Sequence, residues 1–174
     1  MIEITQAKPE DAPGAQQVFY QTWLSTYPNE EFGVTVEDVK DRFQDRITEN
    51  GVAKMAKKIA EPRLNTLFLV AKDGEKIIGV CRALKNEEKN QLTAIYVLPD
   101  YQGKGVGQTL WQEVKKFFNP NKKITVEVVT YNQKAISFYQ KLGFVDSSRR
   151  FVDEHFKMKS GAVLPEMEMV IGDK

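Results

Sequence analysis

The chain has 174 residues, which suffices for one domain with a substantial core and is short for two. Hydrophobic residues make up 41% and charged residues 28%, as in ordinary soluble globular proteins. A formal net charge of +1 provides no basic field for nucleic acid. The start, MIEITQAKPED, carries an early acid and no apolar run, and no window reaches the length of a membrane span. We therefore expect one cytoplasmic domain over residues 1–174, without nucleic-acid or membrane partners.

Cysteine and histidine are scarce. Cys81 has no second cysteine for an internal disulfide, which suits a reducing cytosol. It lies between apolar neighbours in IIGVCRA, and this predicts a buried core residue rather than a nucleophile. With His155 as the single histidine and no CxxC pair, we expect no metal site.

The first sixty residues are mostly helical in pattern. A short alternating strand is followed by apolar residues at helical spacing, and YPNEEFG reads as a loop. Thr35 and Asp38 resemble a capping box that opens the next helix. The Asn50-Gly51 pair is expected to break that helix. The expected elements are a strand at 2–7, a helix at 9–27, a helix at 36–47 and a helical piece that ends near Ala60.

The period then changes to that of strands. Asp73-Gly74 predicts a hairpin turn, and a second turn is expected at Ser160-Gly161. Asn132 is expected to cap a helix that Gly143 terminates. The expected elements are strands at 66–72, 76–84 and 90–98, a helix at 108–118, a strand at 123–130, a helix at 133–142, and strands at 144–158 and 165–171. This order predicts an α+β domain, with antiparallel strands first and a strand–helix–strand–helix unit later.

The stretch YQGKGVG, between a strand and a helix, is rich in glycine. Each glycine loses more backbone freedom on folding than any other residue, so three in five positions need a reason. Glycine loops at a helix N-terminus bind anions, most often phosphate, through converging backbone N–H groups. A turn that is glycine-rich only for packing is the alternative.

Three phosphate-binding patterns compete for this loop. A Walker A loop would need Ser or Thr where Gly105 stands. A dinucleotide-binding fingerprint would need a third glycine where Gln108 stands and an acid about 20 residues on, and the nearest acid, Glu127, is mid-strand. The pattern Gln/Arg-x-x-Gly-x-Gly/Ala is that of the pyrophosphate loop of the GNAT acyltransferases. Gln102, Gly105 and Gly107 match it.

A second motif supports this resemblance. YNQKAISFYQKLGF resembles the family pattern Asn-x-x-Ala-x-x-x-Tyr-x-x-x-Gly-Phe, filled by Asn132, Ala135, Tyr139, Gly143 and Phe144. The chain resembles the GNAT superfamily from IEITQAKPEDA to PEMEMVI. The resemblance implies a central twisted, mixed, mostly antiparallel sheet flanked by helices, with splayed central strands. Family habit also implies a homodimer through the late strands.

The resemblance implies acetyl-CoA as co-substrate, without metal. Loop N–H groups would bind the pyrophosphate, the Thr109 hydroxyl would assist, and backbone groups of the preceding strand would meet the pantetheine. Lys104 would lie near the phosphates or be an unpaired surface lysine, and Asn132 would cap its helix, contact pantetheine, or both. The implied cofactor residues are Ile95, Tyr96, Val97, Gln102, Gly103, Lys104, Gly105, Val106, Gly107, Thr109, Asn132 and Ala135.

Two residues are candidates for proton transfer. Tyr139 fills the family position of the general acid that protonates the leaving thiolate, and it shares a helix face with Asn132. Its alternative is a core aromatic beside Phe138. Glu127, a charge inside a β-branched strand, is the candidate base. An outward-facing position is equally compatible with its pattern, and His155 is less suited to the role.

The resemblance implies that the acceptor amine meets the first two helices, their connecting loop and the last hairpin. Trp23 and Tyr27, with Glu30 and Glu31, would suit a cation through cation–π and ionic contacts. The layout weakly resembles the bacterial polyamine acetyltransferases, so the predicted function is N-acetylation of a small primary amine. A peptide N-terminus as acceptor and an acyl-CoA sensor without turnover are the alternatives, and core aromatics beside a charged loop would explain the same residues.

Overall fold

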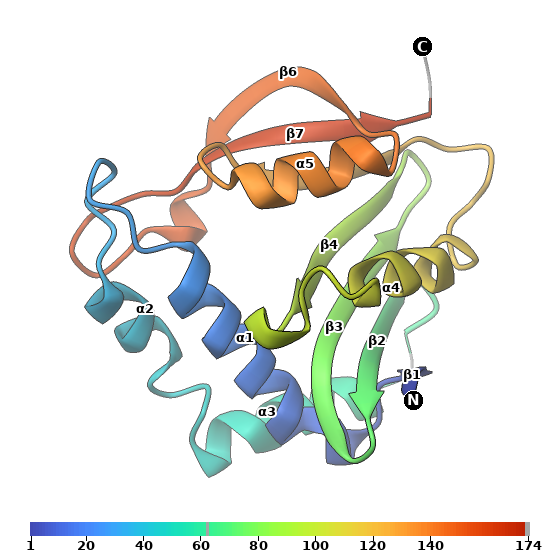
Figure 1. Ribbon diagram of the computed structural model, residues 1–174, viewed down its shortest axis with the longest axis horizontal. Coiled ribbons are helices and arrows are strands. Elements are labelled where there is room, and N and C mark those ends of the chain that lie inside the picture. The colour runs from blue at the N-terminus through green and yellow to red at the C-terminus, as the bar shows by residue number, and fades with distance from the viewer. Residues whose placement is uncertain (62, 173–174) are drawn as a thin grey trace.

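The computed structural model describes residues 1–61 and 63–172. In this part of the chain, seven strands form one sheet in the order β1-β2-β3-β4-β5-β7-β6 (Figure 1). Only β4 and β5 run parallel. The strands are β1 (Ile2–Gln6), β2 (Thr66–Asp73), β3 (Lys76–Lys85), β4 (Asn90–Val97), β5 (Ile124–Val129), β6 (Val145–Val152) and β7 (Pro165–Ile171). The helices are α1 (Ala12–Thr26), α2 (Val36–Phe43), α3 (Glu49–Ala60), α4 (Val106–Lys115) and α5 (Gln133–Lys141), with short 3-10 turns η1 (Pro9–Asp11), η2 (Pro99–Tyr101) and η3 (Glu154–Phe156).

The helices cover the two faces of the sheet. In Figure 1, α4 and α5 lie in front of the strands. A Cβ on Gly79 of β3 would come within 3.2 Å of Leu110 in α4, so the absence of a side chain there lets α4 approach the sheet. On the opposite face, Tyr96 of β4 packs edge-on against Phe19 of α1, with ring centroids 5.6 Å apart. The predicted α+β class with a mixed, mostly antiparallel sheet is confirmed.

The predicted splay of the central strands is confirmed by the pairing of β4 and β5. The two strands pair only where Asn90–Leu92 meets Ile124–Val126. β4 then continues to Val97 and β5 to Val129 without pairing to each other. An opening therefore lies between the second halves of the two strands.

Asn90 fixes the closed end of this opening. Its side chain is fully buried, and its amide donates to the carbonyl oxygens of Asn119 (2.8 Å) and Lys122 (3.1 Å). Its carbonyl oxygen accepts from the Asn119 backbone N–H at 2.9 Å. Because a buried carboxamide is costly unless its groups are hydrogen-bonded, these contacts hold the loop before β5 against the start of β4.

One expected helix boundary is wrong. Asn50 and Gly51 do not break a helix; they lie in the first turn of α3, where the Thr48 hydroxyl accepts from the Gly51 N–H at 3.2 Å. A Cβ on Gly51 would collide with the backbone of Asp45 and Arg46. Glycine at this position therefore lets the preceding turn pack against the start of α3, which local sequence does not reveal.

Other expected boundaries shift for local reasons. α2 ends at Phe43 rather than at residue 47, because the chain turns there towards α3. β6 ends at Val152 rather than at residue 158, and Ser148 within it has a left-handed φ of 66° beside a register shift. The expected turn at Ser160-Gly161 is present, with Gly161 at a φ of 94°. Within the described ranges, no helix is long and apolar enough to cross a membrane.

Gly51→Ala tests the packing at the start of α3. Helix propensity alone predicts a gain of about 1 kcal/mol in the free energy of unfolding. The backbone collision predicts the opposite sign, a loss of about 1–3 kcal/mol. Urea unfolding of this variant beside the exposed Asn50→Ala neighbour, which should stay within about 0.5 kcal/mol, measures the sign. A stabilised Gly51→Ala protein would contradict the collision.

Candidate functional site

The three glycines of the loop before α4 serve two purposes. Gly103 and Gly105 have left-handed φ values of 73° and 83°, which side chains disfavour, and Gly105 is the N-cap of α4. Gly107 has an ordinary φ, but a Cβ there would lie 3.3 Å from the Phe138 ring of α5. Glycine is thus favoured at two positions by the backbone conformation, and at the third by the close approach of α5.

The loop presents unused hydrogen-bond donors. To the other described residues, the backbone N–H groups of 103–107 donate no hydrogen bond. A Cβ built on Gly103 or Gly105 would meet nothing within 4 Å. These free N–H groups lie before and within the first turn of α4, where the helix dipole adds partial positive charge. The arrangement is that of an anion-binding loop.

Two side chains of the loop have internal partners. The Thr109 hydroxyl donates to the Gly105 carbonyl at 3.1 Å, so its proton is already used within the turn. The Gln102 amide donates to the Val97 carbonyl at 3.0 Å and ties the loop to the end of β4. Lys104 is exposed, with its ammonium 5.4 Å from the centroid of the Tyr101 ring.

Backbone groups of β4 face the opening in alternation. Leu98 donates to Ile78 of β3 at 2.9 Å, and Tyr96 pairs with Val80 in the same antiparallel register. Because hydrogen-bonding direction alternates along a strand, Tyr96 points its N–H and C=O to β3, while Ile95 and Val97 point theirs to the side that β5 has left. The backbone groups of Tyr96, predicted to contact the cofactor, are therefore directed to β3 and not to the opening.

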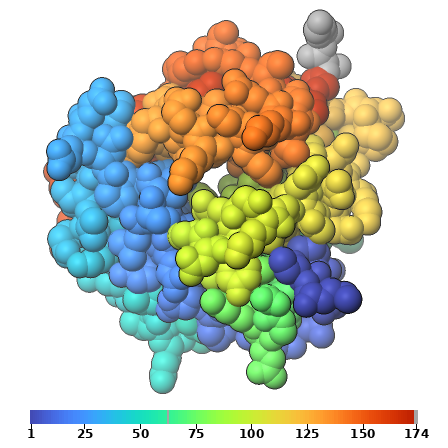
Figure 2. All heavy atoms as spheres, in the orientation of Figure 1, coloured from blue at the N-terminus to red at the C-terminus, as the bar shows by residue number. Residues whose placement is uncertain are grey.

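The opening is visible on the surface. Figure 2 shows a hollow between the orange α5 segment, the yellow-green glycine loop and the blue N-terminal helical part, with green strand atoms at its depth. Asn132 caps α5, as predicted, and its carbonyl oxygen accepts from the Ala135 N–H at 3.2 Å. That bond uses the carbonyl oxygen of Asn132 and leaves its amide N–H groups without a hydrogen bond to a described residue.

Tyr139 lies on the buried face of α5. Its side chain is 6% exposed, and its ring packs edge-on against Phe144 at 5.7 Å between centroids. Its hydroxyl makes no hydrogen bond to a described residue. Burial raises the pKa of Tyr139 well above its ordinary value, and nearby Tyr96 and Cys81 raise it further. The phenol therefore stays protonated throughout the physiological range.

On the other face of the sheet, two tyrosines meet. The hydroxyls of Tyr27, the C-cap of α1, and Tyr96 in β4 are 3.0 Å apart. The Tyr131 hydroxyl donates to the Tyr27 carbonyl at 2.8 Å and holds the end of α1 in place. Burial raises the pKa of both Tyr27 and Tyr96, so the pair is neutral.

The expected acceptor residues are not all brought together. Trp23 packs against Tyr27 with ring centroids 4.5 Å apart, but the Arg42 guanidinium lies 5.2 Å from the Trp23 ring centroid. The cationic partner of Trp23 is thus supplied by the chain itself. Glu30 and Glu31 are exposed in the loop between α1 and α2.

Two glutamates of the sheet differ in environment. Glu127 of β5 has a 30% exposed side chain, 3.6 Å from the Arg149 guanidinium. Glu166 of β7 is only 8% exposed, and its Oε2 atom is buried without a hydrogen-bond partner among the described residues. Burial raises the pKa of Glu166 to about 7, and the charges of Glu127 and Asp153 contribute.

Comparison with known proteins decides the family. The profile of the acetyltransferase (GNAT) domain matches residues 23–160. The chain belongs to the GNAT acetyltransferase family. It is therefore an acyltransferase, and both sequence motifs lie within the matched range.

Relatives of this GNAT chain are distant. Spermidine N(1)-acetyltransferase of Thermoplasma acidophilum is 25% identical over 146 residues, covering 82% of this chain and 88% of the relative. The structure of PaiA N-acetyltransferase from the same organism, in complex with coenzyme A, aligns with a TM-score of 0.66 at 24% identity, covering 97% of this chain and 98% of that one. The ribosomal-protein-S18-alanine N-acetyltransferase of Escherichia coli aligns with a TM-score of 0.63 at 20% identity, covering 98% and 93%. The two structures share the fold.

Glu166 was missed in the sequence. It lies in PEMEMVI, which we interpreted only as a strand. A charged residue inside a strand needs a reason, and this signal is present at Glu166 as well as at Glu127. What the sequence does not contain is the pairing of β7 between β5 and β6, which buries Glu166.

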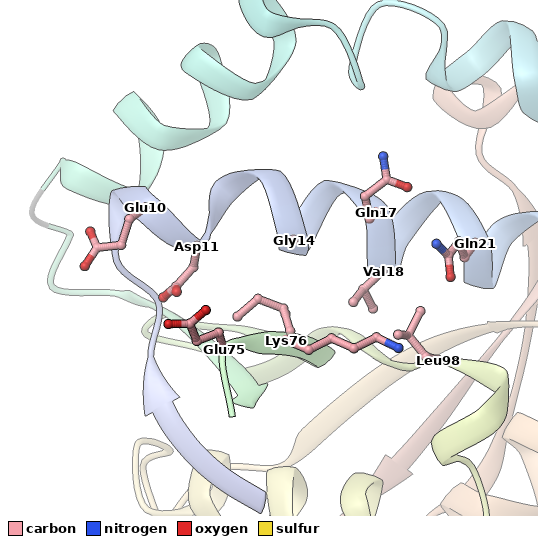
Figure 3. Close-up of a pocket in the computed structure, with 10 residues that line it drawn as sticks. Glu10, Asp11, Gly14, Gln17, Val18, Gln21, Glu75, Lys76 and Leu98 are labelled. Atoms are coloured by element: carbon pink, nitrogen blue, oxygen red, sulfur yellow. The ribbon is translucent and has the colours of Figure 1, made fainter. Parts of the chain in front are cut away.

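A separate pocket of about 370 Å³ opens between the start of α1 and the β2–β3 hairpin (Figure 3). Its lining includes Glu10, Asp11 and Glu75. Asp11 is internally satisfied, since Lys72 approaches one carboxylate oxygen to 2.6 Å and the Lys8 N–H the other to 2.8 Å. None of the predicted site residues line this pocket. Among the described residues, no group of three or more His, Cys, Asp or Glu side chains is placed to hold a metal ion.

Glu166→Gln tests the buried carboxyl through stability. Folding raises the pKa of Glu166 to about 7, so the folded state keeps a proton that the unfolded state releases near pH 4.3. The wild-type protein therefore loses about 2–3 kcal/mol of unfolding free energy from this group between pH 4.3 and 7. Glutamine removes this loss, so the variant should gain stability relative to wild type as the pH rises from about 5 to about 8. Urea unfolding at both values measures it; an unchanged difference between the two proteins would contradict the raised pKa.

Proposed function

We propose that this GNAT protein transfers the acetyl group of acetyl-CoA to a primary amine of a small molecule by direct attack. The observation that carries the proposal is the opening between β4 and β5. It is bordered by the glycine loop and α5 on one face of the sheet and by the Tyr27–Tyr96 pair on the other. Such an opening lets a thioester reach an amine through the sheet.

The cofactor would lie along the loop and the freed edge of β4. Free N–H groups of 103–107 would bind the pyrophosphate, with Lys104 close by. Backbone groups of Ile95 and Val97 and the amide of Asn132 would hydrogen-bond the pantetheine. The Val97 N–H would polarise the thioester carbonyl as an oxyanion donor does. The coenzyme A complex of PaiA N-acetyltransferase, which has the same fold, supports this placement.

Tyr139 would protonate the leaving thiolate. Its phenol is protonated and lacks a partner in the described chain, on the α5 side of the opening. A thiol has an ordinary pKa of about 8.5, so a positioned donor assists its departure. Cys81, the chain's single cysteine, is buried and burial raises the pKa of its thiol, which is unfavourable for a covalent acetyl-enzyme.

The acceptor that we favour is a polyamine. The 25% identical relative is a spermidine N(1)-acetyltransferase, and the acceptor side carries the carboxylates of Glu127 and Glu166. A peptide N-terminus is the second candidate, supported by the fold shared with the S18-alanine acetyltransferase. CoA release with spermidine and with an alanine-terminated peptide separates the two. Action in the cytoplasm, and a homodimer through the late strands, remain predictions from the sequence.

Acetyl-CoA binding at the loop is tested with a pair of glycine variants. Acetyl-CoA at 100 times its dissociation constant should raise the wild-type Tm by about 5 °C or more, unlike NADH or ATP. Gly105→Ala and Gly74→Ala both place a side chain at a left-handed φ with open space around it, so each should lose about 1–2 kcal/mol of stability. Only Gly105→Ala should also weaken the acetyl-CoA shift. Equal shifts in the two variants would show that the loop does not bind the cofactor.

Tyr139→Phe tests the general acid. The change removes only a hydroxyl that no described residue bonds, so fold and acetyl-CoA shift should persist. We expect kcat to fall by about 10²-fold while KM for acetyl-CoA stays within about twofold. Steady-state CoA release measures both constants. Wild-type kcat in the variant would assign Tyr139 to the core instead.

A further inference from the structure

Glu166 faces the acceptor side of the sheet from an interior strand. It lies opposite Val129 of β5 and Phe151 of β6, so β7 is flanked on both sides at this point. Val129 belongs to the apolar cluster of Tyr27, whereas Met167, the next residue on β7, packs into the core on the other face. Because strand side chains alternate, the Glu166 carboxyl is directed towards the Tyr27 side.

Among the described residues, the Glu166 carboxyl has no cationic partner, whereas the Glu168 carboxyl has two. Its Oε2 atom is buried without a hydrogen bond to a described residue. Glu168, two residues on and on the same face, lies 3.1 Å from the Arg149 guanidinium and 3.6 Å from the Lys89 ammonium. An unpaired buried carboxyl is costly, so Glu166 is suited to a donor that arrives from outside the chain.

The surroundings of Glu166 favour a cationic donor. The charged groups that act on it are the carboxylates of Glu127 on β5 and Asp153 after β6. From α1 and β4 it is faced by the neutral phenols of Tyr27 and Tyr96, whose pKa values its charge raises. Two carboxylates beside a third attract a primary ammonium more strongly than any neutral ligand.

Resting on the function proposed above, we propose that Glu166 binds the ammonium of the acceptor and takes its proton, as the catalytic base. One proton passes from the ammonium to the carboxylate, and the freed nitrogen lone pair attacks the thioester carbonyl. The tetrahedral intermediate collapses with cleavage of the C–S bond, and the nitrogen loses a second proton. Tyr139 protonates the sulfur and is itself reprotonated. The sum is amide, CoA thiol and one proton released to water.

This assignment replaces Glu127 as the base. Glu127 is 30% exposed and lies 3.6 Å from the Arg149 guanidinium, so its carboxylate already has a cationic partner within the chain. Among the described residues, no cation is one of the charges that act on Glu166, and its pKa of about 7 suits proton transfer near neutral pH. In this scheme Glu127 acts on the reaction through its charge on Glu166.

The decisive experiment is the pH profile of kcat/KM for the amine, between about pH 5.5 and 9. The amine is the best substrate in a panel that includes spermidine and an alanine-terminated peptide. The wild-type profile should rise to a plateau with an apparent pKa of about 7, that of Glu166 in the free enzyme. In Glu166→Gln, activity should fall by about 10²-fold and keep rising with pH, because only amine that is already neutral reacts.

Three companion measurements isolate the role. Glu168→Gln, on the same strand and face, should keep the wild-type profile. Glu127→Gln should keep the rising limb but move it to lower pH, because the charge of Glu127 raises the pKa of Glu166. The Tm shift with acetyl-CoA should be the same in all of these variants, which checks folding and the cofactor site.

Two results would overturn the assignment. In the first, the rising limb near pH 7 survives in Glu166→Gln or is lost in Glu127→Gln instead. Either finding would exclude Glu166 as the base, while the proposed acetyl transfer would stand. A wild-type protein that acetylates no amine of the panel would reject the proposed function and the base together. The acetyl-CoA Tm shift then tells whether a cofactor site without turnover is left.

Discussion

The divergence of β4 from β5 is the feature on which the rest of this structure depends. Buried backbone N–H and C=O groups are almost always hydrogen-bonded, so strands that part in the middle of a sheet leave groups that need another partner. Here the buried side chain of Asn90 holds the strands together at one end, and pairing stops at Leu92. Beyond that point, Ile95 and Val97 present backbone groups to an opening instead of to a neighbouring strand. The glycine loop begins where this edge ends, tied to it by Gln102.

The opening connects two chemically different faces. On the α4 and α5 face are the free N–H groups of the loop and the Tyr139 phenol, which suit an anionic cofactor and a departing thiolate. On the α1 face are Tyr27, Tyr96 and Glu166, which suit a cation. A protein with both sets on one face would bring cofactor phosphates and acceptor carboxylates close together, with mutual repulsion. Separation by the sheet would keep them apart except at the opening, where the thioester and the amine would meet in the proposed reaction.

Sequence reasoning succeeded where the cause is local. The left-handed glycines and the cap at Asn132 are properties of a few adjacent residues, and the motifs that contain them also identified the fold. It failed where the cause is packing between segments. Gly51 is needed because the backbone of the preceding turn packs against it, and the ring of Trp23, expected to meet a substrate cation, lies beside Arg42 of another helix. Glu166 and Glu168 lie on the same strand and face, but Arg149 and Lys89 pair with Glu168. A single sequence shows neither the strand pairing nor these ion pairs.

The acceptor side also indicates how a cation would be selected. Trp23 is the obvious cation–π residue in the sequence, yet its ring lies beside Arg42, which would repel an incoming ammonium. Glu166 instead faces the Tyr27–Tyr96 pair, and the carboxylate of Glu127 acts on it. In the proposed reaction, repulsion by Arg42 and attraction by Glu127 and Glu166 would direct a primary amine towards β7 rather than to the α1–α2 aromatics. At Glu166 an ammonium would replace lost hydration with an ionic hydrogen bond, and a neutral ligand of the same shape would not.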